Sequence, residues 1–128
     1  MEKKWFEISE DELESRMIRH NLTHNEPCTR AGAMVFAMLD KILVRLGVDI
    51  ENDIQLQQER LGIMIAETND KSPSAPDGRR MPNGLFVIRD FKPYAFIRPA
   101  EVNHLGEMFC EAELWEKNEL LELKCGKI

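Results

Sequence analysis

The sequence predicts an α+β fold in which two or three N-terminal helices, one of them fully buried, pack on a three- to four-stranded antiparallel sheet. Two observations support this prediction: apolar residues recur at helical spacing in the first half of the chain, and alternation with period two follows residue 84. Helices and strands in separate blocks are typical of the α+β class. Residues 1–128 are expected to form a single domain, because their number is close to the usual domain size and no linker or repeat interrupts them.

The first and third predicted helices begin at recognisable caps. Ser9-Glu10-Asp11-Glu12 is a capping box, which predicts a helix over about residues 10–20 with Asn21 as its stop. Asp49 is expected to cap a third helix. Residues 61–66 fit the end of that helix or a strand, because periodicity does not separate the two in a short apolar run.

The second predicted helix is the most apolar element of the chain. Thr29 can cap it, and it runs to about Leu46, where Gly47 closes it. From Ala31 to Leu39 it is apolar on every side, so we expect it to be buried all round.

A long irregular segment separates the helices from the strands. Residues 70–84 hold three prolines and two glycines, which excludes regular structure there. Leu85–Ile88 and Tyr94–Ile97 then alternate around a turn and predict a β-hairpin. Residues 108–115 and 120–125 predict two further strands.

Charge is distributed unevenly along this acidic chain. The net charge is −6, which argues against nucleic acid as a partner. Residues 71–98 nevertheless carry six Lys or Arg against two Asp or Glu, and they lie between two acidic arms. A regulatory or inhibitor protein, which would use its acidic arms to bind a basic surface, is a further function that this charge pattern allows.

The basic segment, residues 71–98, supplies the candidate binding residues. Arg79, Arg80, Arg89 and Arg98 are expected to bind an anion, because the planar guanidinium suits carboxylate and phosphate groups. Long loops also carry function more often than cores do. We therefore interpret the chain as a small binding or accessory protein that contacts an anionic small molecule or a protein partner through this segment. Unprotected strand edges also predict a homodimer.

Metal and thiol chemistry are not predicted. His20, His24 and Cys28 are spaced four apart, but Asn21 and Pro27 separate them and a fourth ligand is missing. No cofactor or metal is therefore expected. No secretory signal or membrane-spanning run is present, and three unpaired cysteines suit a reducing compartment, so a soluble cytoplasmic protein is expected.

Two short stretches resemble parts of the hotdog-fold acyl-CoA thioesterases. Ala31-Gly32-Ala33 followed by Asp40 resembles the start and the acidic position of that family's central helix, and Phe96–Ala100 resembles a later strand motif. The resemblance implies a hotdog-like alternative for the fold and a thioesterase alternative for the function. Asp40 would then be the catalytic carboxylate, and N–H groups near Gly32 would polarise the thioester carbonyl.

Overall fold

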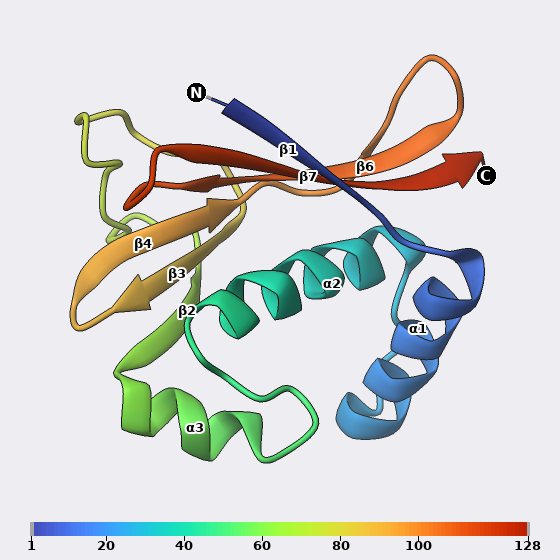
Figure 1. The fold of residues 1–128 in the computed structure, drawn as a ribbon, viewed down its shortest axis with the longest axis horizontal. Coiled ribbons are helices and arrows are strands. Elements are labelled where there is room, and N and C mark those ends of the chain that lie inside the picture. Colours follow the sequence, from blue (N-terminus) through green and yellow to red (C-terminus); the bar gives the residue numbers. More distant parts are fainter. Residues whose placement is uncertain (1, 128) are drawn as a thin grey trace.

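The structure, a computed structural model, describes residues 2–127, and it confirms the α+β class. Within that range three helices and seven strands follow one another in this order: β1 (Glu2–Glu7), α1 (Glu10–His24), α2 (Arg30–Arg45), α3 (Ile54–Leu61), β2 (Ile63–Glu67), β3 (Leu85–Arg89), β4 (Lys92–Ile97), β5 (Glu101–Val102), β6 (Glu107–Leu114) and β7 (Glu119–Lys127). The helices lie together on one side of the strands (Figure 1).

The described strands form one open, mixed sheet rather than the three or four antiparallel strands expected. Its order is β1-β7-β6-β4-β3-β2, and the short β5 pairs with β6 beside this path. β1 runs parallel to β7, whereas the other pairs are antiparallel. The charged start of the chain carries no strand signal of its own. β1 forms because β7, at the other end of the chain, offers it an edge.

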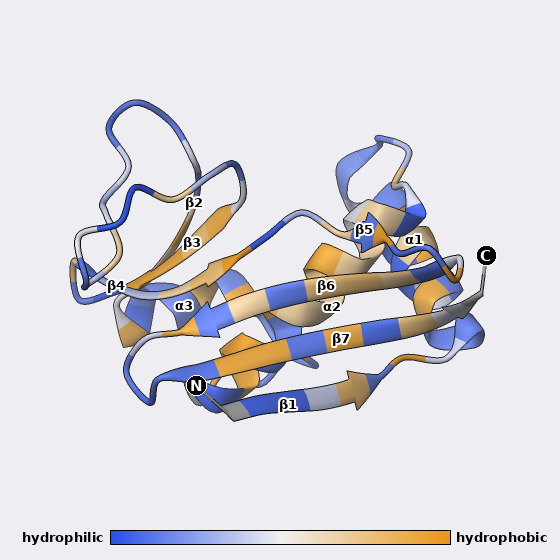
Figure 2. Cartoon of the chain, turned by 90° about the horizontal axis from the view of Figure 1, so that it is seen from above, coloured by the Kyte–Doolittle hydropathy of each residue, from blue (hydrophilic) through white to orange (hydrophobic). Residues whose placement is uncertain are grey.

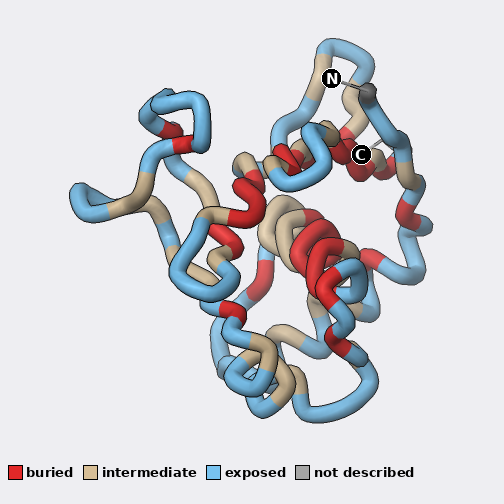
Figure 3. Tube along the Cα trace, turned by 60° about the vertical axis from the view of Figure 1, so that its left-hand side comes forward, coloured by how far each residue is buried: buried red, intermediate tan, exposed pale blue. Residues whose placement is uncertain are grey.

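Helix α2 crosses beneath the sheet and supplies much of the core (Figure 1). Thr29 caps it as predicted, since its hydroxyl accepts the Gly32 N–H at 3.0 Å. The expectation that this helix is buried all round is wrong. One flank, with Val35 and Phe36, is only partly buried. Figure 3 shows buried and partly buried stretches side by side along this helix.

Helix α1 begins where the capping box predicted and ends later. The Ser9 hydroxyl accepts a first-turn N–H at 3.1 Å. The helix continues to His24, and Asn25, at φ 55°, is its left-handed cap. Asn21 is therefore not the stop; its side-chain oxygen instead accepts the N–H of Cys28 at 2.5 Å and holds the connection to α2.

Helix α3 is shorter than predicted, and a strand follows it. Asp53, not Asp49, caps its start by accepting the Leu56 N–H, and Gly62 at φ 71° ends it. Residues 63–67 then form β2, so the strand alternative for this apolar run is correct.

The hairpin and the two later strands are confirmed. β3 pairs with β4 and β6 with β7, both in antiparallel register. Hydrophobic and hydrophilic residues alternate over residues 121–125 of β7 (Figure 2), as expected of a strand with one face on the core. Asp90 and Phe91 form the β3–β4 turn at φ 50° and 67°.

The segment between β2 and β3 is irregular, as predicted, but it is anchored to the sheet. Ala75 and Met81 pack with Phe86 and Phe96 in a second, smaller cluster. Val87, next to Phe86 in β3, belongs to the core around α2. Because neighbouring residues of a strand face opposite ways, this second cluster lies on the face of the sheet away from α2.

The described part of the chain contains no membrane-crossing helix, because none of its helices combines the necessary length with an apolar enough composition.

Candidate functional site

The four arginines expected to share an anion site lie in different surroundings. Arg79 and Arg98 both bind Glu113, as described below. Arg80 donates to the main-chain carbonyl of Asp70 at 3.3 Å. Arg89 lies at the end of β3, beside the hairpin turn. The structure therefore brings only two of the four together, and it does so around a carboxylate of the protein itself.

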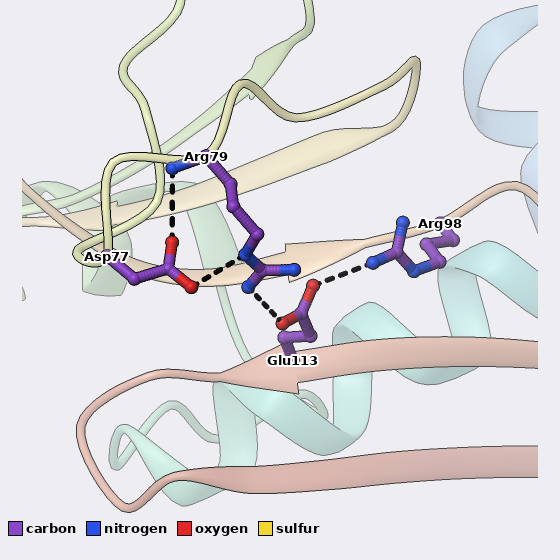
Figure 4. Close-up of polar contacts among 4 residues, drawn as sticks. All are labelled: Asp77, Arg79, Arg98 and Glu113. Atoms are coloured by element: carbon purple, nitrogen blue, oxygen red, sulfur yellow. Dashed lines mark hydrogen bonds and ion pairs between the residues drawn. The ribbon is translucent and has the colours of Figure 1, made fainter.

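Glu113 joins the irregular segment to the sheet (Figure 4). Its side chain projects from β6 and is only 4% exposed. One carboxylate oxygen accepts from Arg79 at 2.7 Å and the other from Arg98 at 2.8 Å. We call this group of three residues the Glu113 clamp. It ties the loop carrying Arg79 to the end of β4.

The charges of the clamp are matched within the protein. The pKa of the Arg79 guanidinium is raised, first by its hydrogen bond to Glu113 and then by that to Asp77. Asp77 accepts both the backbone N–H and the side chain of Arg79, and the backbone hydrogen bond is the main cause of its lowered pKa. Arg79 and Arg98 therefore position the loop, and a free anion would compete with Glu113 for them.

A pocket of about 580 Å³ lies beside the β3–β4 hairpin, and we call it the hairpin pocket. Arg89 and Lys92 line it and stand opposite each other in register. Within residues 2–127 neither forms an ion pair. Trp115 also lines the pocket, and its buried indole N–H has no acceptor among the described residues. Asp90 and Glu116 also line the pocket, so two carboxylates face the two cations and the field there is mixed.

A larger cleft of about 690 Å³ opens between α2 and the last strands of the sheet, and we call it the α2–β2 cleft. Its helix wall is the partly buried flank of α2. Its sheet wall comes from β2, the start of β3 and the end of β4. The apolar lining residues are Val35, Phe36, Leu39, Ile65, Leu85, Ile97 and Pro99.

Polar groups are few in the α2–β2 cleft. Among the described residues that line the cleft, one side chain is ionisable, that of Glu67. This residue lies at the exposed end of β2. The Thr68 hydroxyl lies 3.0 Å from the Pro82 carbonyl and 3.1 Å from that of Gly84. Because the hydroxyl is directed to these carbonyls, it fastens β2 to the segment before β3. The cleft therefore suits a ligand with an apolar body.

Asp40 lies away from the α2–β2 cleft. Its carboxylate pairs with the guanidinium of Arg16 on α1, and its side chain is 17% exposed. It lines a separate hollow near Phe6, whereas Gly32 lines the α2–β2 cleft. The thioesterase resemblance implies that Asp40 and the start of the helix near Gly32 line one pocket. In the structure they line two different ones.

His20 and His24 make ring contacts, and the three cysteines are buried. The ring of His20 lies 4.5 Å from that of His24 and 4.6 Å from that of Phe36, between centroids. Within residues 2–127 no three His, Cys, Asp or Glu side chains are grouped to hold a metal. Cys28 is buried, as are the other two cysteines, and burial raises the pKa of Cys110 to about 12. A thiol with so high a pKa is a poor nucleophile.

Comparison of the chain with protein-family models, with curated proteins and with solved structures finds no match.

Two features of this geometry escaped sequence reasoning. Glu113 alternates with apolar residues along β6, and that pattern assigns it to the face away from the core; its burial comes from the loop folded over it. The α2–β2 cleft depends on where the sheet ends relative to α2. The apolar character of residues 31–39 signalled burial, and nothing local marked the uncovered flank.

Proposed function

We propose that this protein is a non-catalytic binding protein that holds a ligand with an apolar body in the α2–β2 cleft. The observation that carries the proposal is the cleft itself, about 690 Å³ with mostly apolar walls. Binding sites for small ligands are typically concave, mainly apolar and of roughly 300–1,000 Å³. Apolar surface buried on binding would supply most of the affinity.

The lining supports binding rather than catalysis. Nucleophilic catalysis needs a hydroxyl, thiol, amine, imidazole or carboxylate that neighbouring groups activate and hold in place. Of the described lining residues, Thr68 has its hydroxyl directed to backbone carbonyls and Glu67 lies at the exposed rim. Asp40, the carboxylate that a thioesterase would need, is paired with Arg16 elsewhere.

Filling the cleft is expected to abolish binding of an apolar probe. Val35 is on the cleft wall, and Val35→Phe adds a ring to that space. We expect the Kd of the neutral dye Nile red, measured by fluorescence titration, to rise about tenfold or more, which corresponds to losing roughly 1.4 kcal/mol of binding free energy.

The matched control is the same change elsewhere on the same helix. Val44 is 53% exposed and lies outside the cleft, so Val44→Phe should leave the Kd within about twofold. Equal affinities for Val35→Phe and the unchanged protein would show that the dye binds somewhere else and would reject the cleft as the site.

The hairpin pocket supports a second candidate, contact with an anionic ligand or partner through the basic segment. Arg89 and Lys92 are cations without ion-pair partners in the described chain, and the Trp115 indole N–H beside them lacks an acceptor. An oxyanion in the pocket could accept from Arg89 and Lys92, whereas the buried Trp115 nitrogen would have to become exposed before it could donate to the anion. Of the four arginines predicted to bind an anion, this candidate site keeps Arg89. It leaves out Arg79 and Arg98, because both are paired with Glu113.

Titration with inorganic phosphate checks this second candidate. We expect saturable NMR shifts at Arg89, Lys92 and the Trp115 indole, lost in Arg89→Ala/Lys92→Ala because the charge-assisted hydrogen bonds are removed. Arg19→Ala/Arg60→Ala removes two exposed arginines from α1 and α3 and should leave the titration unchanged. Shifts that persist in the first variant, or that spread evenly over the cationic residues, would refute a site at the hairpin.

A further inference from the structure

The free edge of β2 lies beside the α2–β2 cleft. β2 is the last strand of the sheet, paired with β3 alone. Thr68 donates to the Gly84 carbonyl at 3.1 Å, and Asp90 donates to the Gly62 carbonyl at 2.9 Å. In an antiparallel pair every second residue exchanges hydrogen bonds with its partner. The even-numbered residues of β2 therefore bond to β3.

It follows that the main-chain groups of Ile63, Ile65 and Glu67 point outward from the sheet. Their side chains all lie on one face. Ile63 belongs to the core around α2, while Ile65 and Glu67 line the cleft. A strand added to this edge would place its own alternate side chains on the same face, in the cleft against α2.

The opposite edge of the sheet is protected, and the β2 edge is not. β1, at that other edge, carries Lys3 and Lys4, which pair with Glu122 at 2.6 Å and with Glu119 at 3.5 Å. Charged side chains, lysine above all, discourage further pairing of an edge strand. β2 reads Ile-Met-Ile-Ala-Glu and has neither lysine nor proline.

We propose that the α2–β2 cleft receives an extended segment of a partner protein, which adds to β2 as a further antiparallel strand. The added strand pairs with the outward main-chain groups of Ile63, Ile65 and Glu67 and places an apolar side chain in the cleft. This inference rests on the proposed function for the apolar part of the site, and it adds the main-chain recognition that a small apolar ligand does not need.

Charge selects the kind of segment. Glu67 is at the exposed end of β2, and the whole chain carries −6. A Lys or Arg on the cleft-facing side of the added strand would therefore be favoured near Glu67, and an acidic segment would be repelled.

A second copy of this chain fits the same edge less well. Two β2 strands related by a two-fold axis through Ile65 would place each Glu67 opposite the other copy's Ile63. Ile63 is 7% exposed and packs in the core, so the carboxylate would lie against an apolar site. Two chains of −6 would also repel each other.

Binding of a designed peptide tests the proposal. The probe is an acetylated, amidated nine-residue peptide, TKTVTVTKT, whose valines and lysines share one face of a strand. We expect saturable binding by isothermal titration calorimetry. Methylation of the two valine nitrogens removes the N–H groups that an antiparallel strand directs at β2, and should weaken binding about tenfold or more.

Variants of β2 supply the matching evidence from the protein. Glu67→Pro removes one outward N–H, a position where an edge strand tolerates proline, and should weaken peptide binding about tenfold. Glu67→Gln removes only the charge and should weaken it less. Far-UV circular dichroism and the urea midpoint, compared with those of the unchanged protein, check that both variants remain folded.

The outcomes separate this inference from the proposed function. If Nile red binds the cleft but the peptide does not bind, or binds equally well when methylated at valine, the added strand is refuted and the apolar site stands. If neither probe binds, the proposed function fails as well. Self-association that Glu67→Pro abolishes, seen by sedimentation without peptide, would assign the edge to a second copy and overturn the partner segment.

Discussion

Replacing Arg79 and Arg98 together by alanine is expected to destabilise the fold strongly and to release the loop before β3. Both cations that bind Glu113 are then lost, and its carboxylate, 4% exposed, is left buried without a partner. Breaking a buried ion pair by removing one side typically costs about 3–5 kcal/mol. We expect the protein's free energy of unfolding, measured by urea denaturation, to fall by about 3 kcal/mol, the lower end of that range because the two arginines are partly exposed.

The reverse deletion should be milder. Glu113→Gln leaves two arginines that are partly exposed, at 49% and 32% of their side chains, and both can turn to water. Adding Glu113→Gln to the double alanine variant removes the stranded charge, so it should recover part of the lost stability. Arg19→Ala/Arg60→Ala controls for loss of two exposed arginines. A double variant as stable as that control would contradict a structural role for the clamp.

The structural role of Arg79 complicates binding experiments on variants of this residue. The clamp holds a loop whose Ala75 and Met81 pack against the sheet. Weaker ligand binding in an Arg79 variant would therefore follow from a loosened loop as readily as from a lost ligand contact. Substitutions at Arg89 and Lys92 avoid this ambiguity, because neither forms an ion pair within residues 2–127.

Gly84→Ala is expected to be the second strongly destabilising change. A Cβ at this position would collide with the main-chain oxygen of Ile97 and would lie 2.5 Å from the ring of Phe96. Phe96 is fully buried against Phe86, with ring centroids 5.0 Å apart, so its ring has no room to move. Overpacking of this kind typically costs about 1–3 kcal/mol, and the clash with main chain places this case at the upper end, near 3 kcal/mol.

Thermal and urea denaturation measure this effect, and another glycine controls for it. A loss near 3 kcal/mol would lower the melting temperature by roughly 10 °C in a chain of this size. Gly126 also lies in a strand, and an added Cβ there meets nothing within 4 Å. Gly126→Ala should therefore change stability by less than about 0.5 kcal/mol. Similar losses for both variants would show that the close approach of Gly84 to β4 is not tight.

Features set by neighbouring residues could be predicted from the sequence. Ser9 and Thr29 cap their helices as the residue pattern indicated, because a cap needs only a side-chain oxygen and an N–H three residues on. The β3–β4 hairpin and strands β6 and β7 follow alternation over a few residues. The irregular segment before β3 was evident from its prolines and glycines alone.

Features that depend on distant partners could not. The parallel pairing of β1 with β7 joins the two ends of the chain, and the binding of Arg79 and Arg98 to Glu113 joins three separate segments. In the sequence these two arginines look like free cations. Their partner, Glu113, becomes buried and meets them only when the loop folds over β6. The α2–β2 cleft likewise exists only because the sheet ends at β2 and leaves a flank of α2 uncovered. Local hydrogen bonds and side-chain periodicity determined which elements form, whereas long-range packing decided which charges are satisfied and which apolar surface stays open.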